Sequence, residues 1–138
     1  WTITRYEVDL DHKIGIGFFS DVYKGTWRDQ TVAIKLLAET TSRTLFVREA
    51  GLWKMLSHPN IVPLLGASSA SSDPPWFFVS PYYKHGNLVK FLKGLPSLSQ
   101  ELVLRCMREI AAGMAYLHQS DVLHGDLKGT NVLVDDNL

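Results

Sequence analysis

Three polar residues near the C-terminal end of the chain have side chains that together could support phosphoryl transfer. Asp126, Lys128 and Asn131 follow one another at intervals of two and three positions. A carboxylate such as Asp126 can accept a proton from an attacking hydroxyl, and the ammonium of Lys128 can neutralise charge on a transferring phosphoryl group. The amide oxygen of Asn131 is a suitable ligand for Mg²⁺. Because the apolar run Val132-Leu133-Val134 follows at once, we interpret the stretch as part of a site and not as an ordinary polar turn.

A second pair of charges lies in the N-terminal half of the sequence. Lys35 belongs to a strand-like run, and Glu49 falls near the middle of an apolar helical stripe. The stripe consists of Leu45, Phe46, Leu52, Trp53 and Leu56. Burying an unpaired carboxylate is costly, so Glu49 needs a partner, and Lys35 is the available candidate. The alternative is that Glu49 lies at the edge of the stripe. A paired Lys35 would be held in place to bind phosphate oxygens.

The segment Ile14 to Val22 nearly matches the pattern G-x-G-x-x-G, with Ser20 in the third position. In a dinucleotide-binding fold such a loop joins a strand to a helix, whereas here a strand-like run continues from Val22. The loop is therefore predicted to join two strands. Gly15 and Gly17 would let backbone N–H groups approach phosphate closely. An ordinary glycine-rich turn is the alternative for this motif taken alone.

The periodicity of the chain predicts the elements that position these residues. Strands are expected at residues 8–10, 22–27, 31–37, 61–65 and 76–79, with a surface loop over 67–75. Helices are expected from Ser42 to a stop at His58-Pro59-Asn60, over 86–92, and from Ser97 or Ser99 to His118. Ser97 and Gln100 have the spacing of a capping box. The last helix has a predicted buried stripe of Val103, Cys106, Met107, Ile110, Met114 and Leu117. This order predicts an α+β fold with a five-stranded antiparallel sheet, one inserted helix and a following helical part.

Composition excludes several classes of protein. The chain has 138 residues, 46% of them hydrophobic, and 14 basic residues balance 14 acidic ones. Nothing in this balance favours nucleic acid or an anionic membrane as a partner. Cys106 alone cannot form an internal disulfide, and the first residues lack a signal-peptide pattern, so we expect a cytoplasmic, intracellular protein without a membrane segment.

Taken together, the motifs resemble a protein kinase domain of the tyrosine-kinase-like Ser/Thr group. The resemblance rests on Gly15 and Gly17, Val32-Ala33-Ile34-Lys35, Glu49, His58-Pro59-Asn60-Ile61-Val62, and the run from His124 to Asn131. It covers the whole chain, which corresponds to about the first half of the family's domain. It implies a partial kinase domain over residues 1–138, with an N-lobe at 8–82 and the hinge exit and beginning of a C-lobe at 83–138.

The resemblance also implies ATP and Mg²⁺ as cofactors and assigns roles to individual residues. Lys35 would hold the α- and β-phosphates and pair with Glu49, Asp126 would be the catalytic base, and Asn131 would bind a metal ion. Lys128 would complete the catalytic set. Val22 and Ala33 would form the roof over adenine and Leu133 the floor, with Ser80 as gatekeeper and Pro81 and Tyr83 in the hinge. Ile14, Gly15 and Gly17 would be further ATP-binding positions. Pro81 lacks an N–H group but keeps its carbonyl.

Lys128, two positions after Asp126, resembles the Ser/Thr-specific pattern, so the expected activity is transfer of the ATP γ-phosphoryl group to Ser or Thr hydroxyls of proteins. Gly125 replaces the usual Arg, which argues against switching by a phosphorylated activation loop. His-Gly-Asp-Leu also resembles aminoglycoside and choline phosphotransferases, which is one alternative. The sequence contains no Asp-Phe-Gly or Ala-Pro-Glu, so we expect negligible activity from this chain as given. A non-catalytic nucleotide-binding or decoy module is the other alternative.

Overall fold

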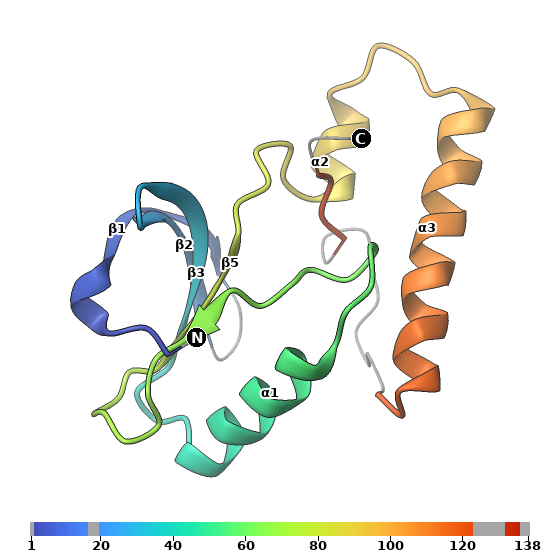
Figure 1. Cartoon of the computed structure of the whole chain (residues 1–138). Helices are drawn as coiled ribbons and strands as arrows, with labels where there is room; N and C mark the ends of the chain where they lie inside the picture. Colours follow the sequence, from blue (N-terminus) through green and yellow to red (C-terminus); the bar gives the residue numbers. More distant parts are fainter. Residues whose placement is uncertain (1, 17–19, 123–131, 136–138) are drawn as a thin grey trace. The chain divides into compact units, whose positions relative to one another are not determined.

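The computed structural model describes residues 2–16, 20–122 and 132–135, and it confirms the predicted α+β class (Figure 1). A five-stranded antiparallel sheet has the order β1-β2-β3-β5-β4. Its strands are β1 (Val8–Ile16), β2 (Ser20–Trp27), β3 (Gln30–Leu37), β4 (Gly66–Ala67) and β5 (Phe77–Pro81). The helices are a 3₁₀ turn η1 (Arg5–Glu7), α1 (Arg43–Met55), α2 (Leu88–Lys93) and α3 (Gln100–Gln119).

The chain divides into two compact units. The first unit comprises Trp1–Ser57 and Val62–Tyr82 and contains the sheet and α1. The second unit comprises His58–Ile61 and Tyr83–Leu138 and contains α2 and α3.

The register of the sheet decides which side chains share a face. Lys35 on β3 lies opposite Val22 on β2 and Phe78 on β5. Because side chains alternate along a strand, Ala33 and Ser80 lie on this face as well. We call it the lysine face. Neighbouring residues such as Ile34 point to the opposite face.

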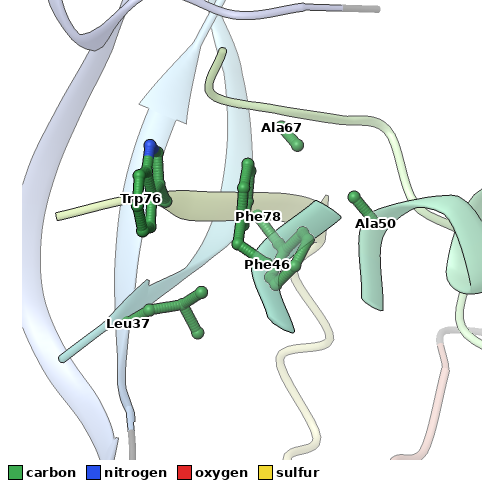
Figure 2. Close-up of a cluster of buried hydrophobic side chains, with 6 residues drawn as sticks. All are labelled: Leu37, Phe46, Ala50, Ala67, Trp76 and Phe78. Atoms are coloured by element: carbon green, nitrogen blue, oxygen red, sulfur yellow. The ribbon is translucent and has the colours of Figure 1, made fainter. Parts of the chain in front are cut away.

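Each face carries its own hydrophobic core. On the lysine face, part of the surface is covered by α1, and the buried cluster there is the helix-side core (Figure 2), which consists of Leu37, Phe46, Ala50, Ala67, Trp76 and Phe78. The opposite face buries Ile3, Val32, Ile34, Phe77 and Val79. The N-terminal segment closes this second core, because Ile3 is buried and its N–H donates to the carbonyl of Ala67 at 2.8 Å.

Helix α1 touches the sheet along a narrower line than the sequence predicts. Phe46 and Ala50 are buried, whereas Leu45 is 58% exposed and Leu52 is 43% exposed, so the predicted stripe is wrong at these two leucines. The Phe46 ring stacks on Trp76 with centroids 5.3 Å apart and contacts Phe78 at 5.2 Å. The small side chain of Ala50 lets the helix approach the sheet, and leucines to either side of that line remain in solvent.

The predicted strand at 61–65 is also wrong, since β4 comprises only Gly66–Ala67. Ile61 donates its N–H to the carbonyl of His58 in a turn, and pairing with β5 begins only where Leu65 N–H donates to the carbonyl of Val79 at 2.8 Å. The predicted surface loop begins later than residue 67, because Ala67 and Ser68 are buried. Ser68 Oγ accepts from the N–H of Phe77 at 3.0 Å and extends the pairing.

In the second unit, side-chain caps fix where the helices begin. Asn87 caps α2 by accepting from Lys90 N–H at 2.9 Å. Ser99 caps α3 by accepting from Leu102 N–H at 3.1 Å, so Ser99 and not Ser97 is the cap. Leu117 is buried, but Met107 is 61% exposed, so the predicted stripe of α3 is wrong at its N-terminal half.

None of the helices in the described part of the chain combines the length and the apolar character needed to cross a bilayer.

The packing of α1 predicts how two substitutions change the free energy of unfolding. Phe46→Ala should lower the free energy of unfolding by about 3–5 kcal/mol, because a buried aromatic ring is lost and a cavity remains. Leu45→Ala, one position away on the exposed side, should cost less than about 1 kcal/mol. Urea denaturation followed by circular dichroism measures both. Equal losses for the two variants would show that Leu45 is also packed in the core.

Candidate functional site

The predicted ion pair between Lys35 and Glu49 is present in the structure. Lys35 Nζ, from β3, lies 3.0 Å from Glu49 Oε1, from α1. The same ammonium lies 5.9 Å from the centroid of the Phe78 ring, which is fully buried on the neighbouring strand. The lysine is therefore held from two sides, by a carboxylate on the helix and by an aromatic face on the sheet.

The Lys35–Glu49 pair is more exposed than the sequence predicts. The side chain of Glu49 is 46% exposed and that of Lys35 is 36% exposed, so the prediction of a buried carboxylate is wrong. Glu49 is not buried because α1 contacts the sheet through Phe46 and Ala50, and Glu49 lies beside this line of contact. Exposed ion pairs contribute only about 0–1 kcal/mol to stability. The pair therefore orients the lysine more than it stabilises the fold.

Small and apolar side chains surround Lys35 on the lysine face. Val22 lies opposite Lys35, and Ala33 lies opposite Ser80; all three neighbours are half-buried. Gly15 on β1 lies opposite Val22. A Cβ atom on Gly15 would meet Val22 Cβ at 3.5 Å, an ordinary contact distance, so packing within the sheet does not itself require glycine here. This part of the face places the small side chains of Val22, Ala33 and Ser80 beside the Lys35 ammonium.

The other predicted site residues fall into three groups. Ile14, 43% exposed on β1, and Pro81, opposite Val32, belong to the first unit with the residues above. Tyr83 and Leu133 belong to the second unit. Gly17, Asp126, Lys128 and Asn131 lie outside the described residues.

The second unit fixes the backbone around Leu133 through hydrogen bonds to the start of α2. Leu88 N–H donates to the carbonyl of Val132 at 2.7 Å, and Val134 N–H donates to the carbonyl of Gly86 at 3.0 Å. Val134 is buried, while the side chain of Leu133 between them is 46% exposed. Tyr83 accepts a hydrogen bond on its carbonyl from Gly86 N–H at 3.0 Å.

Sequence reasoning missed two contributors on the lysine face. Phe78 supports the Lys35 ammonium, and the alternation of residues 76–79 could have suggested its face, but the register between β3 and β5 is not readable from sequence. Lys24 Nζ lies 5.1 Å from the centroid of the Tyr82 ring. No sequence pattern predicts that contact.

No group of three His, Cys, Asp or Glu side chains suited to a metal ion occurs within the described ranges. The predicted ligand Asn131 lies outside them.

A β-sheet with an inserted helix whose carboxylate pairs with a strand lysine is the arrangement expected of a protein kinase. Residues 8–138 match the family model described as protein tyrosine and serine/threonine kinase. The chain belongs to the protein kinase family, whose members bind ATP and generally use Mg²⁺.

Curated relatives include tyrosine-protein kinase Abl of Drosophila melanogaster, which is 37% identical over 99% of this chain. Tyrosine-protein kinase ABL2 of Homo sapiens is 34% identical and tyrosine-protein kinase SPK-1 of Girardia tigrina 36% identical, each over 99% of this chain. The chain spans 9%, 12% and 28% of the length of these three relatives, respectively.

These relatives correct one expectation. The sequence predicted a Ser/Thr kinase, chiefly through Lys128, but the relatives are tyrosine-protein kinases, so the Ser/Thr assignment is wrong. The physical reason is that phosphoryl transfer relies on positioning. Acceptor choice then depends on the surfaces that hold the acceptor, and one loop residue is a weak indicator of it.

Because the Lys35–Glu49 ion pair is exposed, we expect it to contribute little to the stability of the fold. Glu49→Gln should change the free energy of unfolding by no more than about 1 kcal/mol, and the change should shrink at high salt. Glu109→Gln is the matched control, because Glu109 is 49% exposed and pairs with Arg105 at 3.1 Å on α3. Urea denaturation at low and high salt measures both. A loss well above that of the control, unaffected by salt, would mean that the carboxylate is buried in solution.

Proposed function

We propose that this chain is the ATP-binding portion of a protein kinase that transfers the γ-phosphoryl group of ATP to a protein hydroxyl. The observation that supports this most directly is the Lys35–Glu49 ion pair of 3.0 Å beside the apolar strip of Val22 and Ala33. The strip suits a flat aromatic base, and the fixed ammonium suits phosphate oxygens. The family match favours this proposal over a small-molecule phosphotransferase.

In the proposed binding mode, Lys35 holds the α- and β-phosphates, and Glu49 keeps its ammonium in position. Ile14, Gly15, Val22 and Ala33 of the first unit cover the nucleotide, and Gly17 is assigned with them on sequence alone. Ser80 is assigned as the gatekeeper and Pro81 as an adenine contact through its carbonyl. Tyr83 and Leu133, which belong to the second unit, are assigned to adenine recognition from the sequence resemblance alone. Residues 8–82 are then the N-lobe, and residues 83–138 the hinge exit and the beginning of the C-lobe.

The transfer step is assigned to the segment around Asp126. Asp126 takes the proton of the attacking hydroxyl, and Lys128 neutralises charge on the transferring group. Asn131 is the proposed ligand of Mg²⁺, which supplies charge neutralisation at the phosphates when bound. These roles rest on residue types and spacing.

A tyrosine side chain of a protein is the proposed acceptor, because the relatives named above are tyrosine-protein kinases. An intracellular location, suggested by the single Cys106, is part of the same proposal.

ATP binding tests the proposal directly. Titration calorimetry should detect ATP binding by the 138-residue chain, and Lys35→Met should weaken it about tenfold or more, since a charge-assisted hydrogen bond to phosphate is lost. Lys93→Met on α2 removes the same charge from an exposed position in the second unit and should leave affinity unchanged. Failure of the unmodified chain to bind ATP, or equal effects of the two substitutions, would contradict the proposal.

A further inference from the structure

The edge of the sheet that carries Gly15 contains an irregularity that the proposed function does not explain. Strand β1 pairs with β2 through Lys13↔Tyr23 and then through Gly15↔Val22, so two steps on β1 correspond to one step on β2. Ile14 is the extra residue of this β-bulge. Bulges interrupt the ladder and re-aim the side chains beyond them. Here the bulge lies at Ile14, directly before Gly15, and both residues are assigned to nucleotide binding.

An ion pair spans the bulge. Lys13, before the bulge, places its Nζ 3.2 Å from Oδ2 of Asp21. Asp21 pairs in the ladder with Ile16, after the bulge. The two charged side chains therefore connect β1 on one side of the irregularity to β2 on the other, at a place where the backbone pairing is interrupted.

The ion pair lies on the opposite face of the sheet from Lys35. Asp21 and Tyr23 alternate with Val22, whose side chain is on the lysine face. The ammonium of Lys13 also lies 5.8 Å from the centroid of the Tyr23 ring. Its hydrogen bond to the Asp21 carboxylate raises the pKa of Lys13 above the ordinary value. Lys13 thus remains charged at neutral pH, and neither side chain is placed to touch a ligand on the lysine face.

We propose that Lys13 and Asp21 are positioning residues for the nucleotide: their ion pair holds β1 beyond the bulge in register, so that the backbone of Gly15 stays over the phosphate end of ATP. The inference rests on the proposed function and adds a determinant to the same site. Because the pair acts through the backbone of residues 15 and 16, beyond the bulge, its loss should affect ligands with phosphates and not the adenine part.

The test compares ATP, ADP and adenosine, with adenosine measured by displacement of a fluorescent ATP analogue. Lys13→Met and Asp21→Asn should each weaken ATP and ADP about threefold to fivefold, which is the upper range for an exposed ion pair, and the double variant should lose no more than either single one. Adenosine affinity should not change. Lys13→Arg keeps the charge and should restore ATP affinity.

Glu109→Gln is the control for loss of an exposed ion pair, and it should leave all three ligands unaffected. Amide hydrogen exchange at Gly15 and Ile16 should accelerate in Lys13→Met, which a ligand contact alone would not cause.

Three results would overturn the inference. Unchanged ATP affinity in both single variants, alongside a loss in Lys35→Met, would show that the nucleotide site exists without needing the ion pair. Equal weakening of adenosine and ATP would indicate a general structural defect. Absence of ATP binding by the unmodified chain would remove the proposed function and this inference with it.

Discussion

The packing of Phe46 against Trp76 and Phe78 is the contact on which the rest of the candidate site depends. It holds α1 on the sheet along one narrow line, with ring centroids 5.3 and 5.2 Å apart. Glu49 follows Phe46 by three positions, so the contact that anchors the helix also sets where the carboxylate can reach. Phe78 lies opposite Lys35 in the sheet and below its ammonium. One aromatic cluster therefore locates both partners of the ion pair.

In the first unit, one set of interactions stabilises the fold and another fixes the position of the charged side chains. Burial of an aromatic side chain is worth several times more than an exposed ion pair, about 3–5 against about 0–1 kcal/mol. The helix-side core thus maintains the fold, while Lys35 and Glu49 add little to stability and fix the direction of one charge. This separation lets the charged groups remain half-exposed, where a ligand phosphate can displace water without first breaking a buried contact.

Sequence patterns correctly predicted the elements that depend on local periodicity. They failed for the features that depend on which residues pair between strands. Alternation located β2, β3 and β5, and helical spacing located α1 and α3. The charge argument identified the Lys35–Glu49 pair, although its premise of a buried carboxylate was wrong. β4, the bulge at Ile14 and the place of Phe78 depend on register, which the spacing of residues along one strand does not contain. The acceptor class was misjudged because it rested chiefly on Lys128.

Strand β2 is constrained from both faces of the sheet near Val22. On one face Val22 lies opposite Lys35, which is tied to α1, and on the other face the adjacent Asp21 is tied to Lys13. All four charged side chains are between 36% and 46% exposed, so dissolved ions reach both pairs. The aromatic contacts of the helix-side core are not screened in this way. Rising ionic strength should therefore loosen the arrangement of these charged side chains while the fold persists, so the proposed nucleotide site is held more weakly than the sheet and helix that carry it.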